Sequence, residues 1–292
     1  MIWVIISCFF SNAGDLAVKA VRYLPSAQIA WMRVTIGTAL LLPWAFTHRN
    51  ALQFKYPSLQ IGRVIASFSA VWLWSFGASH SSMMAITSIA FLCPVLVLPL
   101  AWLILKEASS LKRVSLVALA FIGVFIVALA ETKQQVNFTS SFFSIGVVSL
   151  LVATFLFALS DVLSKKLIAT HSSWALLFYF LVGSSVLGVG PALMAWEPLG
   201  LKELLVLSLL ASSGILLLLA VLKAMEAYDL AATAPFKYLE LPIAIFWGKV
   251  LFHEQINWLI LLGCALIITS ALWLGRIEHK AQAARLAVKD YN

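Results

Sequence analysis

Residues 231–243 read Ala-Ala-Thr-Ala-Pro-Phe-Lys-Tyr-Leu-Glu-Leu-Pro-Ile and lie in an apolar run that extends from Leu230 to Phe252. A run of about 23 residues is long enough to cross the ~30 Å hydrocarbon core of a bilayer as a helix. Lys237 and Glu240 place two charges near its centre, where each costs about 2.5–3.5 kcal/mol. Charges at that depth must face other protein groups or a wet cavity. The segment therefore predicts both a membrane protein and the candidate functional site of that protein.

The composition of the whole chain agrees with this interpretation. Of the 292 residues, 62% are hydrophobic and 11% are charged, and the mean hydropathy is +0.99, which is far from the values of a soluble domain. Apolar runs of about 20 residues predict an all-α integral membrane protein with ten transmembrane helices. These helices are expected at residues 2–21, 26–47, 59–78, 83–105, 112–130, 143–165, 173–195, 202–225, 230–252 and 257–274.

Lysine and arginine residues are distributed unevenly between the two sides of the predicted helices. With the N-terminus in the cytoplasm, thirteen of them, Arg63 included, fall on the inside and five on the outside. Cytoplasmic loops carry an excess of basic residues, so both termini are predicted to be cytoplasmic, with residues 275–292 as a cytoplasmic tail. This bias explains the net charge of +8 without a nucleic-acid partner. The expected partners are the lipid bilayer and a small-molecule substrate.

The two halves of the chain resemble each other at an offset of 146–147 residues. Asp15-Leu-Ala-Val-Lys19 matches Asp161-Val-Leu-Ser-Lys165. Residues 1–131 and 142–274 are therefore predicted to be two repeats of five helices each. Because five is an odd number, the second repeat enters the membrane upside down. Inverted repeats of this kind are typical of secondary transporters, whose substrate site lies near the membrane midplane between the repeats.

Prolines interrupt matching helices of the two predicted repeats. Pro94 lies in the fourth predicted helix, and Pro235 and Pro242 lie in the ninth. A proline inside a helix removes one hydrogen bond and frees a backbone carbonyl. The prolines indicate either packing kinks or helix breaks at a central binding site, and their matching positions beside Lys237 and Glu240 favour the binding site.

The chain resembles the drug/metabolite transporter superfamily, specifically its EamA-type members, over nearly its whole length. The resemblance rests on the repeat length, on Arg33 in the second helix, and on Glu107 and Glu254, which close the fourth and ninth helices. A small residue commonly precedes that glutamate in the family, whereas Lys106 and His253 stand there in this chain.

Within that superfamily, residues 160–166 and 232–241 are most similar to the S-adenosylmethionine uptake transporters of intracellular bacteria. The resemblance implies a secondary active transporter of the cell inner membrane that works by alternating access. Its implied substrate is S-adenosylmethionine, taken up alone or in exchange for S-adenosylhomocysteine. An EamA-type exporter of amino acids or metabolites is the alternative. Neither implies an enzyme or a cofactor.

The candidate substrate-binding residues suit a ligand with a sulfonium, an ammonium, a carboxylate and an adenine. Glu240 would meet a positive centre, and Lys237 or Arg33 would bind the carboxylate. A structural ion pair between Lys237 and Glu240 is the alternative interpretation of those two residues. Aromatic candidates for stacking and cation–π contacts are Tyr238, Tyr179, Trp31 and Trp74.

Two aspartates complete the candidates. Asp15 and Asp161 each precede a lysine by four residues, which predicts a helical ion pair. The other possibility is a gating or coupling role, since the inverted repeats would place the two carboxylates near opposite faces of the membrane. No cysteine or histidine spacing predicts a metal site, and no phosphate-binding loop of the Walker type is present.

Overall fold

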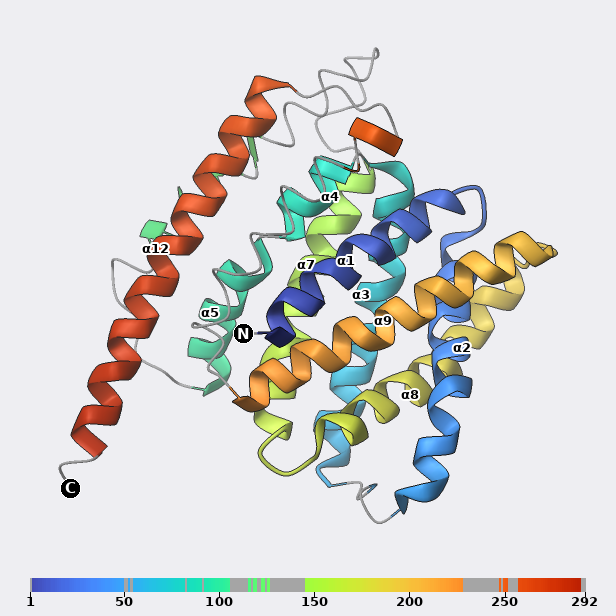
Figure 1. Ribbon diagram of the computed structural model, residues 1–292, viewed down its shortest axis with the longest axis horizontal. Helices are drawn as coiled ribbons and strands as arrows, with labels where there is room; N and C mark the ends of the chain where they lie inside the picture. The colour runs from blue at the N-terminus through green and yellow to red at the C-terminus, as the bar shows by residue number, and fades with distance from the viewer. Residues whose placement is uncertain are drawn as a thin grey trace.

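The computed structural model describes residues 2–49, 52, 55–81, 83–90, 92–105, 115–116, 118–119, 122–123, 125–126, 145–227, 247, 249–251 and 257–289. These residues form helices and connections, and none of them lies in a strand. Figure 1 shows the helical bundle, with both ends of the chain labelled. The helices are α1 (Ile2–Ala20), α2 (Ser26–Thr47), α3 (Pro57–His80), α4 (Met83–Ala90), α5 (Leu92–Leu105), α7 (Ile145–Leu167), α8 (Ser173–Met194), α9 (Leu201–Ala227) and α12 (Trp258–Lys289).

Five of these helices are long and apolar enough to cross a membrane. They are α2, α3, α7, α8 and the Leu201–Glu226 part of α9, with 22 to 26 residues each. At about 1.5 Å per residue each reaches roughly 33–39 Å, which exceeds the ~30 Å hydrocarbon core. The chain is therefore an all-helical, multi-pass membrane protein. Helices α1, α4 with α5, and α12 coincide with three further predicted spans, whereas the predicted spans at 112–130 and 230–252 fall mostly outside the described residues.

Helix α12 is longer than the predicted tenth span. It continues to Lys289 through most of the predicted tail, with 32 residues in all. The sequence explains this extension, because residues 281–287 consist of Ala, Gln, Arg and Leu, which favour the helix. Figure 1 shows α12 along one side of the bundle, where it contacts α4 and α5.

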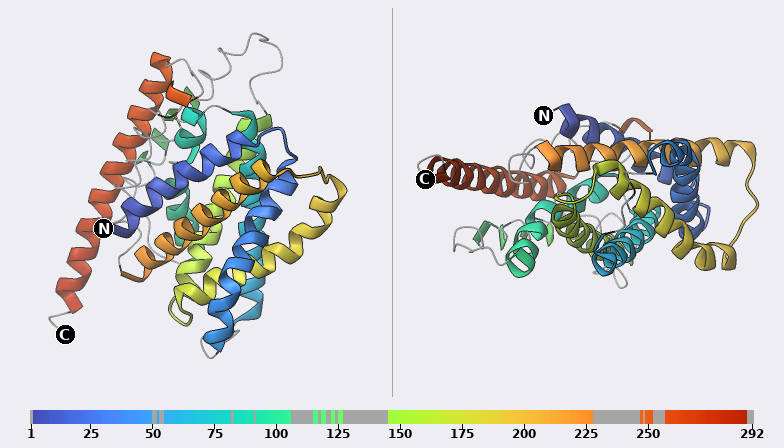
Figure 2. Two further views of the ribbon diagram at one scale, coloured as in Figure 1. Left: turned by 45° about the vertical axis from the view of Figure 1, so that its right-hand side comes forward. Right: turned by 90° about the horizontal axis from the view of Figure 1, so that it is seen from below.

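The main helix pairs join the first half of the chain to the second. Helix α3 packs along α7, α1 along α9, and α2 along α8, as the two views in Figure 2 also indicate. A shift of 146 residues lays α1, α2 and α3 onto α7, α8 and α9. If each helix is replaced by its counterpart in the other half, the α1–α9 pair becomes the α7–α3 pair, and the α2–α8 pair remains the same pair. This is the pairing that two structurally equivalent halves related by a twofold rotation would give.

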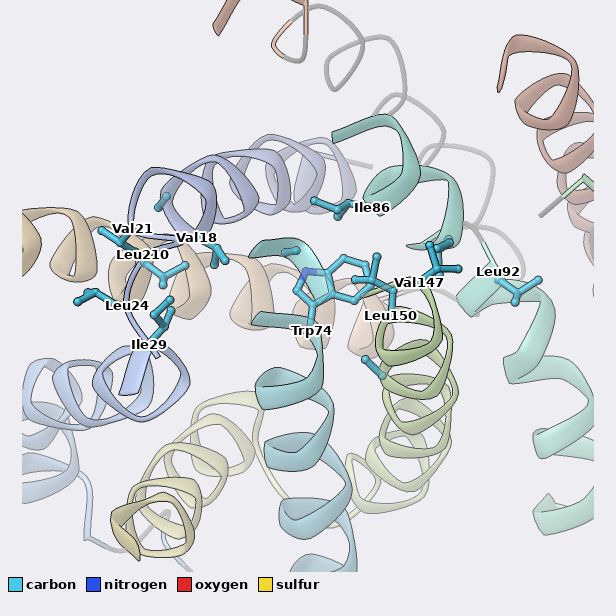
Figure 3. Packing of buried hydrophobic residues seen from close by; sticks show 14 of the residues in the cluster. Val18, Val21, Leu24, Ile29, Trp74, Ile86, Leu92, Val147, Leu150 and Leu210 are labelled. Atoms are coloured by element: carbon cyan, nitrogen blue, oxygen red, sulfur yellow. The ribbon is translucent and has the colours of Figure 1, made fainter. Parts of the chain in front are cut away.

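Apolar side chains fill the space between these pairs. The largest described cluster draws on both halves, with Val18, Ile29, Ile86, Leu150 and Leu210 all fully buried. Figure 3 shows the indole of Trp74 at its centre, between side chains of α4 and α7. A second cluster joins α2, α3, α7, α8 and α9. Burial against protein on these faces leaves the opposite faces of the long helices apolar and exposed, as a lipid-facing surface requires.

Glycines let α3 and α7 approach closely at one end of their contact. A Cβ atom added at Gly77 would lie 2.6 Å from Leu150 Cγ and 2.8 Å from the carbonyl oxygen of Gly146. Small residues at helix crossings are a general means of packing helices in membranes. Because a backbone oxygen cannot rotate away, a side chain at Gly77 would force the two helices apart.

We expect Gly77→Ala to lower the free energy of unfolding by about 1–3 kcal/mol, the usual cost of overpacking. The midpoint of thermal unfolding in detergent measures this loss. Gly62→Ala is the matched control, since its Cβ would have no atom within 4 Å and alanine favours the helix. Equal unfolding midpoints for the two variants would contradict the close contact.

Candidate functional site

A cavity of about 190 Å³ lies between the two halves of the bundle. Its walls come from α1, α2, α3, α7, α8 and α9, with Ala90 of α4 and Cys93 of α5 at one side. Apolar and aromatic groups, including Phe157 and Phe180, form most of the lining. The polar and charged side chains on this wall are Ser7, Ser11, Asp15, Arg33, Ser67, Trp74, Thr154, Ser160 and Asp161.

Asp15 is held at the cavity wall by an indole. The side chain is 8% exposed, and its Oδ1 accepts a 2.8 Å hydrogen bond from Trp74 Nε1. Two cations, Arg33 on α2 and Lys19 one turn along α1, interact with it electrostatically. A carboxylate that is buried in this way needs such partners, because burial without them strongly disfavours the charge. Asp15 is thus a carboxyl group held in place at the cavity wall.

Asp161 supplies the second carboxylate. The Cys93 thiol lies 3.9 Å from its Oδ2 and can donate a weak hydrogen bond to it. The neighbouring residue Ser160 shares a 2.6 Å hydrogen bond with Ser67 across the α3–α7 interface. This second polar group of the cavity therefore lies on α7 and α3, whereas Asp15 and Arg33 lie on α1 and α2.

Arg63 supports Asp161 from behind the cavity wall. It is 1% exposed, its Nε donates to Ser164 Oγ at 2.6 Å, and its Nη1 donates to the Leu176 carbonyl at 3.0 Å. Ser164 lies three positions after Asp161 on α7, so both residues share one face of that helix. The guanidinium interacts electrostatically with Asp161. Arg63 thereby ties α3, α7 and α8 together and compensates the charge of Asp161.

The sequence-predicted aspartates meet at one cavity instead of lying near opposite faces. Asp15 and Asp161 both line it. Each lies about five or six residues before the end of its helix, roughly 8 Å along the axis, and so lies away from the helix end. Arg33 and Trp74, which the sequence indicated as candidate substrate-binding residues, also line it. The structure thus brings four of the candidates together. Arg63, which the sequence placed among the basic residues of the cytoplasmic side, is fully buried within the bundle.

Two predicted aromatic candidates lie away from this cavity. Trp31 donates to the Ser185 carbonyl at 2.9 Å and packs edge-on against Trp196. It is two positions from Arg33, about 200° around the helix, so the two cannot face the same space. Tyr179 is half-buried and faces the ring of His171. The next residue, Phe180, lines the cavity in its place.

The remaining predicted site residues have no described environment. Glu240, Lys237, Tyr238, Pro235 and Pro242 lie outside the described residues. Pro94 is described only as part of the first turn of α5, a position that a proline tolerates. The charged side chains on the described part of the cavity wall come from α1, α2 and α7.

Polar contacts join the two halves at one end of the bundle. Tyr23 donates a 2.6 Å hydrogen bond to Glu203, which raises the pKa of the Tyr23 phenol because the bond requires its proton. Gln28 is fully buried and makes two hydrogen bonds with the backbone of Glu197, one from its Nε2 at 2.8 Å and one to its Oε1 at 3.0 Å. These contacts fasten the α1–α2 connection and the start of α2 to the segment between α8 and α9.

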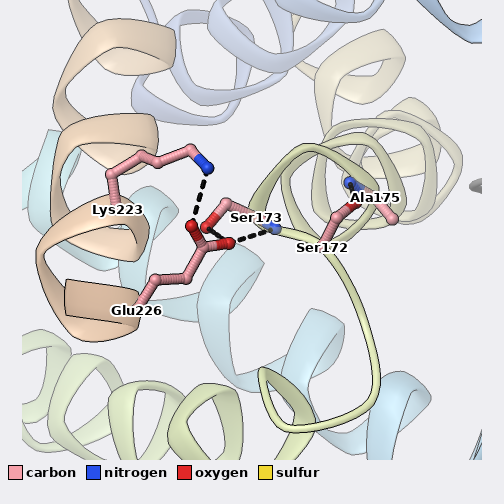
Figure 4. A network of polar contacts seen from close by, with 5 residues as sticks. All are labelled: Ser172, Ser173, Ala175, Lys223 and Glu226. Carbon is pink, nitrogen blue, oxygen red and sulfur yellow. Dashed lines mark hydrogen bonds and ion pairs between the residues drawn. The ribbon is translucent and has the colours of Figure 1, made fainter.

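At the other end of α9, Glu226 closes the N-terminus of α8 (Figure 4). Its Oε1 accepts hydrogen bonds from the backbone nitrogen and Oγ of Ser173, and its Oε2 pairs with Lys223 at 2.6 Å. Ser172 caps the same helix end by accepting a hydrogen bond from the backbone nitrogen of Ala175. Carboxylates are favourable at helix N-termini, so this contact joins α9 firmly to α8.

The described residues contain no group of three or more metal-binding side chains. A charged and aromatic cavity enclosed by apolar, membrane-spanning helices is typical of a binding site for a small molecule within the membrane. A sequence model of the EamA-like transporter family matches residues 1–129 and again residues 144–276, so the chain belongs to this family and is a transporter, not an enzyme.

Individual relatives agree with this assignment. The chain is 30% identical to an S-adenosylmethionine uptake transporter of Rickettsia felis over 285 residues, covering 97% of this chain and 94% of that protein. It is 25% identical to a pseudopaline exporter of Pseudomonas aeruginosa, covering 94% and 95%. A solved crystal structure, 15% identical in sequence, superimposes with a TM-score of 0.68 over 95% of this chain and 98% of the other, which shows the same fold.

Trp74→Phe separates the two roles of the indole at the cavity. The variant keeps an aromatic ring beside Phe157, whose ring packs edge-on against Trp74 at 5.8 Å, but removes the donor to Asp15. A hydrogen bond to a charged group contributes about 1.5–3 kcal/mol, so we expect substrate affinity to fall about tenfold or more. Ligand binding to the purified protein measures this. Trp72→Phe, a tryptophan that does not line the cavity, is the control and should bind normally; equal losses in both variants would contradict the role of Trp74.

Proposed function

We propose that this protein is a secondary transporter that takes up S-adenosylmethionine across the cell inner membrane. In this proposal its ten helices form two inverted five-helix repeats, both termini are cytoplasmic, and the repeats alternate access to the cavity between them. The coupling mode is uptake alone or exchange for S-adenosylhomocysteine. The function rests on the family and on one structural observation, which is the balance of charge at the cavity.

That balance is two carboxylates against one guanidinium. With Asp15, Asp161 and Arg33 all ionised, the charged side chains on the described wall sum to −1. A ligand with two cationic centres and one carboxylate offers the complementary set. S-adenosylmethionine has this set in its sulfonium, its ammonium and its carboxylate, and its net charge is +1. A neutral zwitterion offers no second cation, so Asp161 would keep only the compensation that it has from Arg63.

The aromatic part of the wall suits the rest of the molecule. Trp74, Phe157 and Phe180 line the same cavity as the charged groups. Aromatic faces stack on a planar adenine, and they attract a sulfonium through cation–π contacts worth ~0.5–2 kcal/mol. The 30% identity to a rickettsial S-adenosylmethionine uptake transporter supports the same substrate independently of the cavity.

Uptake of radiolabelled S-adenosylmethionine into proteoliposomes tests the proposal. We expect saturable uptake that unlabelled S-adenosylmethionine competes, and that liposomes without the protein lack. Preloading the vesicles with S-adenosylhomocysteine should accelerate uptake if the protein is an exchanger. Absence of saturable uptake in vesicles that contain folded protein would refute this substrate.

Export of an amino-acid-type metabolite is the second candidate. The similarity to a pseudopaline exporter over 94% of the chain favours export. The carboxylates and the guanidinium on the cavity wall would also bind the ammonium and the carboxylate of an amino acid. Vesicles loaded with labelled amino acids distinguish the two directions. Efflux of an amino acid without uptake of S-adenosylmethionine would establish the exporter.

A further inference from the structure

The guanidinium of Arg33 lies against the backbone of α9 at Gly214. A Cβ atom built on Gly214 would lie 2.7 Å from Nε, 3.0 Å from Nη2 and 3.2 Å from Cζ of Arg33. Nε and Nη2 both lie nearer than Cζ, which joins them, so the edge of the group that carries these two nitrogens meets the helix. A side chain at this position would require the guanidinium to shift, because real Cβ atoms do not approach heavy atoms this closely. Glycine at this position therefore allows the guanidinium to lie in contact with α9.

Arg33 keeps donors for a ligand in this position. It is half-buried and lines the cavity. Within the described part of the chain no acceptor forms a hydrogen bond with its guanidinium, although Asp15 interacts with it electrostatically. With its Nε–Nη2 edge against α9, the guanidinium keeps the edge formed by Nη1 and Nη2, whose N–H groups are spaced to bind both oxygens of a carboxylate.

Asp15 provides the complementary group beside it. Trp74 Nε1 occupies its Oδ1, and a carboxylate has a second oxygen that can accept a hydrogen bond. An ammonium placed at that oxygen would lie near a carboxylate bound to Arg33. The α-ammonium and α-carboxylate of an amino acid are separated by one carbon atom. Two groups this close together suit the neighbouring Asp15 carboxylate on α1 and Arg33 guanidinium on α2.

We propose that Asp15, Arg33 and Gly214 form a subsite for the head group of an α-amino acid, with Gly214 as its specificity-determining residue. This rests on the proposed function and adds the orientation of the substrate. The carboxylate binds the guanidinium edge and the ammonium binds Asp15. The additional cationic centre of the substrate then lies toward Asp161. The bound head group spans α1 and α2 of the first family match and rests on α9 of the second.

Comparing S-adenosylmethionine with its decarboxylated form tests the subsite. The measurement is the dissociation constant of each ligand for purified wild-type protein and for Gly214→Ala. The added methyl group displaces the guanidinium, so we expect the dissociation constant of S-adenosylmethionine to rise about tenfold or more, as for a lost charged hydrogen bond. The decarboxylated ligand should change about twofold or less, because it makes no carboxylate contact.

Two matched glycines control for other effects of a methyl group. Gly190→Ala adds one where nothing lies within 4 Å, and it should leave both dissociation constants unchanged. Gly14→Ala adds one to the same cavity at an ordinary 3.5 Å from Ser213 Oγ, and it should affect both ligands alike. Equal losses for both ligands in Gly214→Ala, or no loss for either, would overturn the subsite. If Gly214→Ala does not fold, Arg33→Lys carries the test with the same expectation, because it keeps the charge and loses the paired donors.

A wild-type protein that binds neither form of S-adenosylmethionine would refute the proposed substrate but not yet the subsite. The same variants are then compared with lysine and with cadaverine, its decarboxylated form, by ligand-induced shifts of the unfolding midpoint. A shift with lysine that Gly214→Ala abolishes would support the head-group subsite. No shift with lysine in the wild type would overturn it.

Discussion

Asp161→Asn is expected to abolish most uptake of S-adenosylmethionine at low substrate concentration while leaving the protein folded. The carboxylate lines the cavity, and in the proposed orientation it faces the sulfonium. Removing one member of a desolvated charge pair costs about 2–5 kcal/mol, so affinity should fall about 30-fold or more. The substitution preserves the shape of the side chain and one acceptor oxygen, but it removes the charge and replaces the second oxygen with an NH2 donor. Equilibrium binding to the purified variant measures it directly.

The charge of the ligand provides the control for this variant. S-adenosylhomocysteine has the same head group and adenine but a neutral thioether in place of the sulfonium. Its affinity for Asp161→Asn should remain within about threefold of the wild-type value, because no ion pair to Asp161 is lost. Equal losses for both ligands would mean that Asp161 acts through the structure of the cavity and not through the sulfonium.

The hydropathy of the chain was enough to predict the five long apolar helices that the structure describes. The long apolar helices α2, α3, α7, α8 and α9 coincide with predicted spans to within a few residues. Hydropathy carries this information because the bilayer imposes one length and one solvent on every span. It could not predict the length of α12, because an extension rich in alanine, glutamine and arginine forms a helix whether or not lipid surrounds it.

The candidate site was predicted in part, and the reason is geometric. Arg33 and Trp74 were selected because charge and aromatic faces suit the ligand, and both line the cavity. Spacing along the chain indicated Asp15 and Asp161 as matching residues of the two halves. The depth of each helix in the bundle is a property of packing, so the sequence alone did not show that they share one cavity.

Trp31 and Gly214 show the same limit of prediction from the sequence alone. Trp31 has the side chain for stacking but points toward α8 and Trp196, since helical phase and neighbours decide its direction. Helical phase could have excluded it, given that Arg33 two positions later faces the cavity. Gly214 carries no sequence signal for its contact with Arg33, because that contact exists only when α2 and α9 are side by side. Pairing of helices far apart in sequence was the missing information.

Arg63→Met is expected to destabilise the protein more than any substitution on the cavity wall. The buried guanidinium compensates Asp161 and supplies donors to Ser164 and to the carbonyl of Leu176. Leaving a buried charge without its partner costs about 3–5 kcal/mol. The midpoint of thermal unfolding and the monodisperse fraction in detergent should therefore both fall steeply, since α3, α7 and α8 lose a shared contact.

A double variant separates this structural role from substrate binding. Combining Arg63→Met with Asp161→Asn removes both charges, and replacing a buried ion pair as a whole is often neutral for stability. We expect the double variant to recover much of the unfolding midpoint yet to bind S-adenosylmethionine as poorly as Asp161→Asn alone. Lys166→Met, which removes an exposed cation at the end of α7, is the control and should change stability little. An Arg63→Met protein as stable as Lys166→Met, or a double variant less stable than Arg63→Met, would contradict the compensation of Asp161 by Arg63.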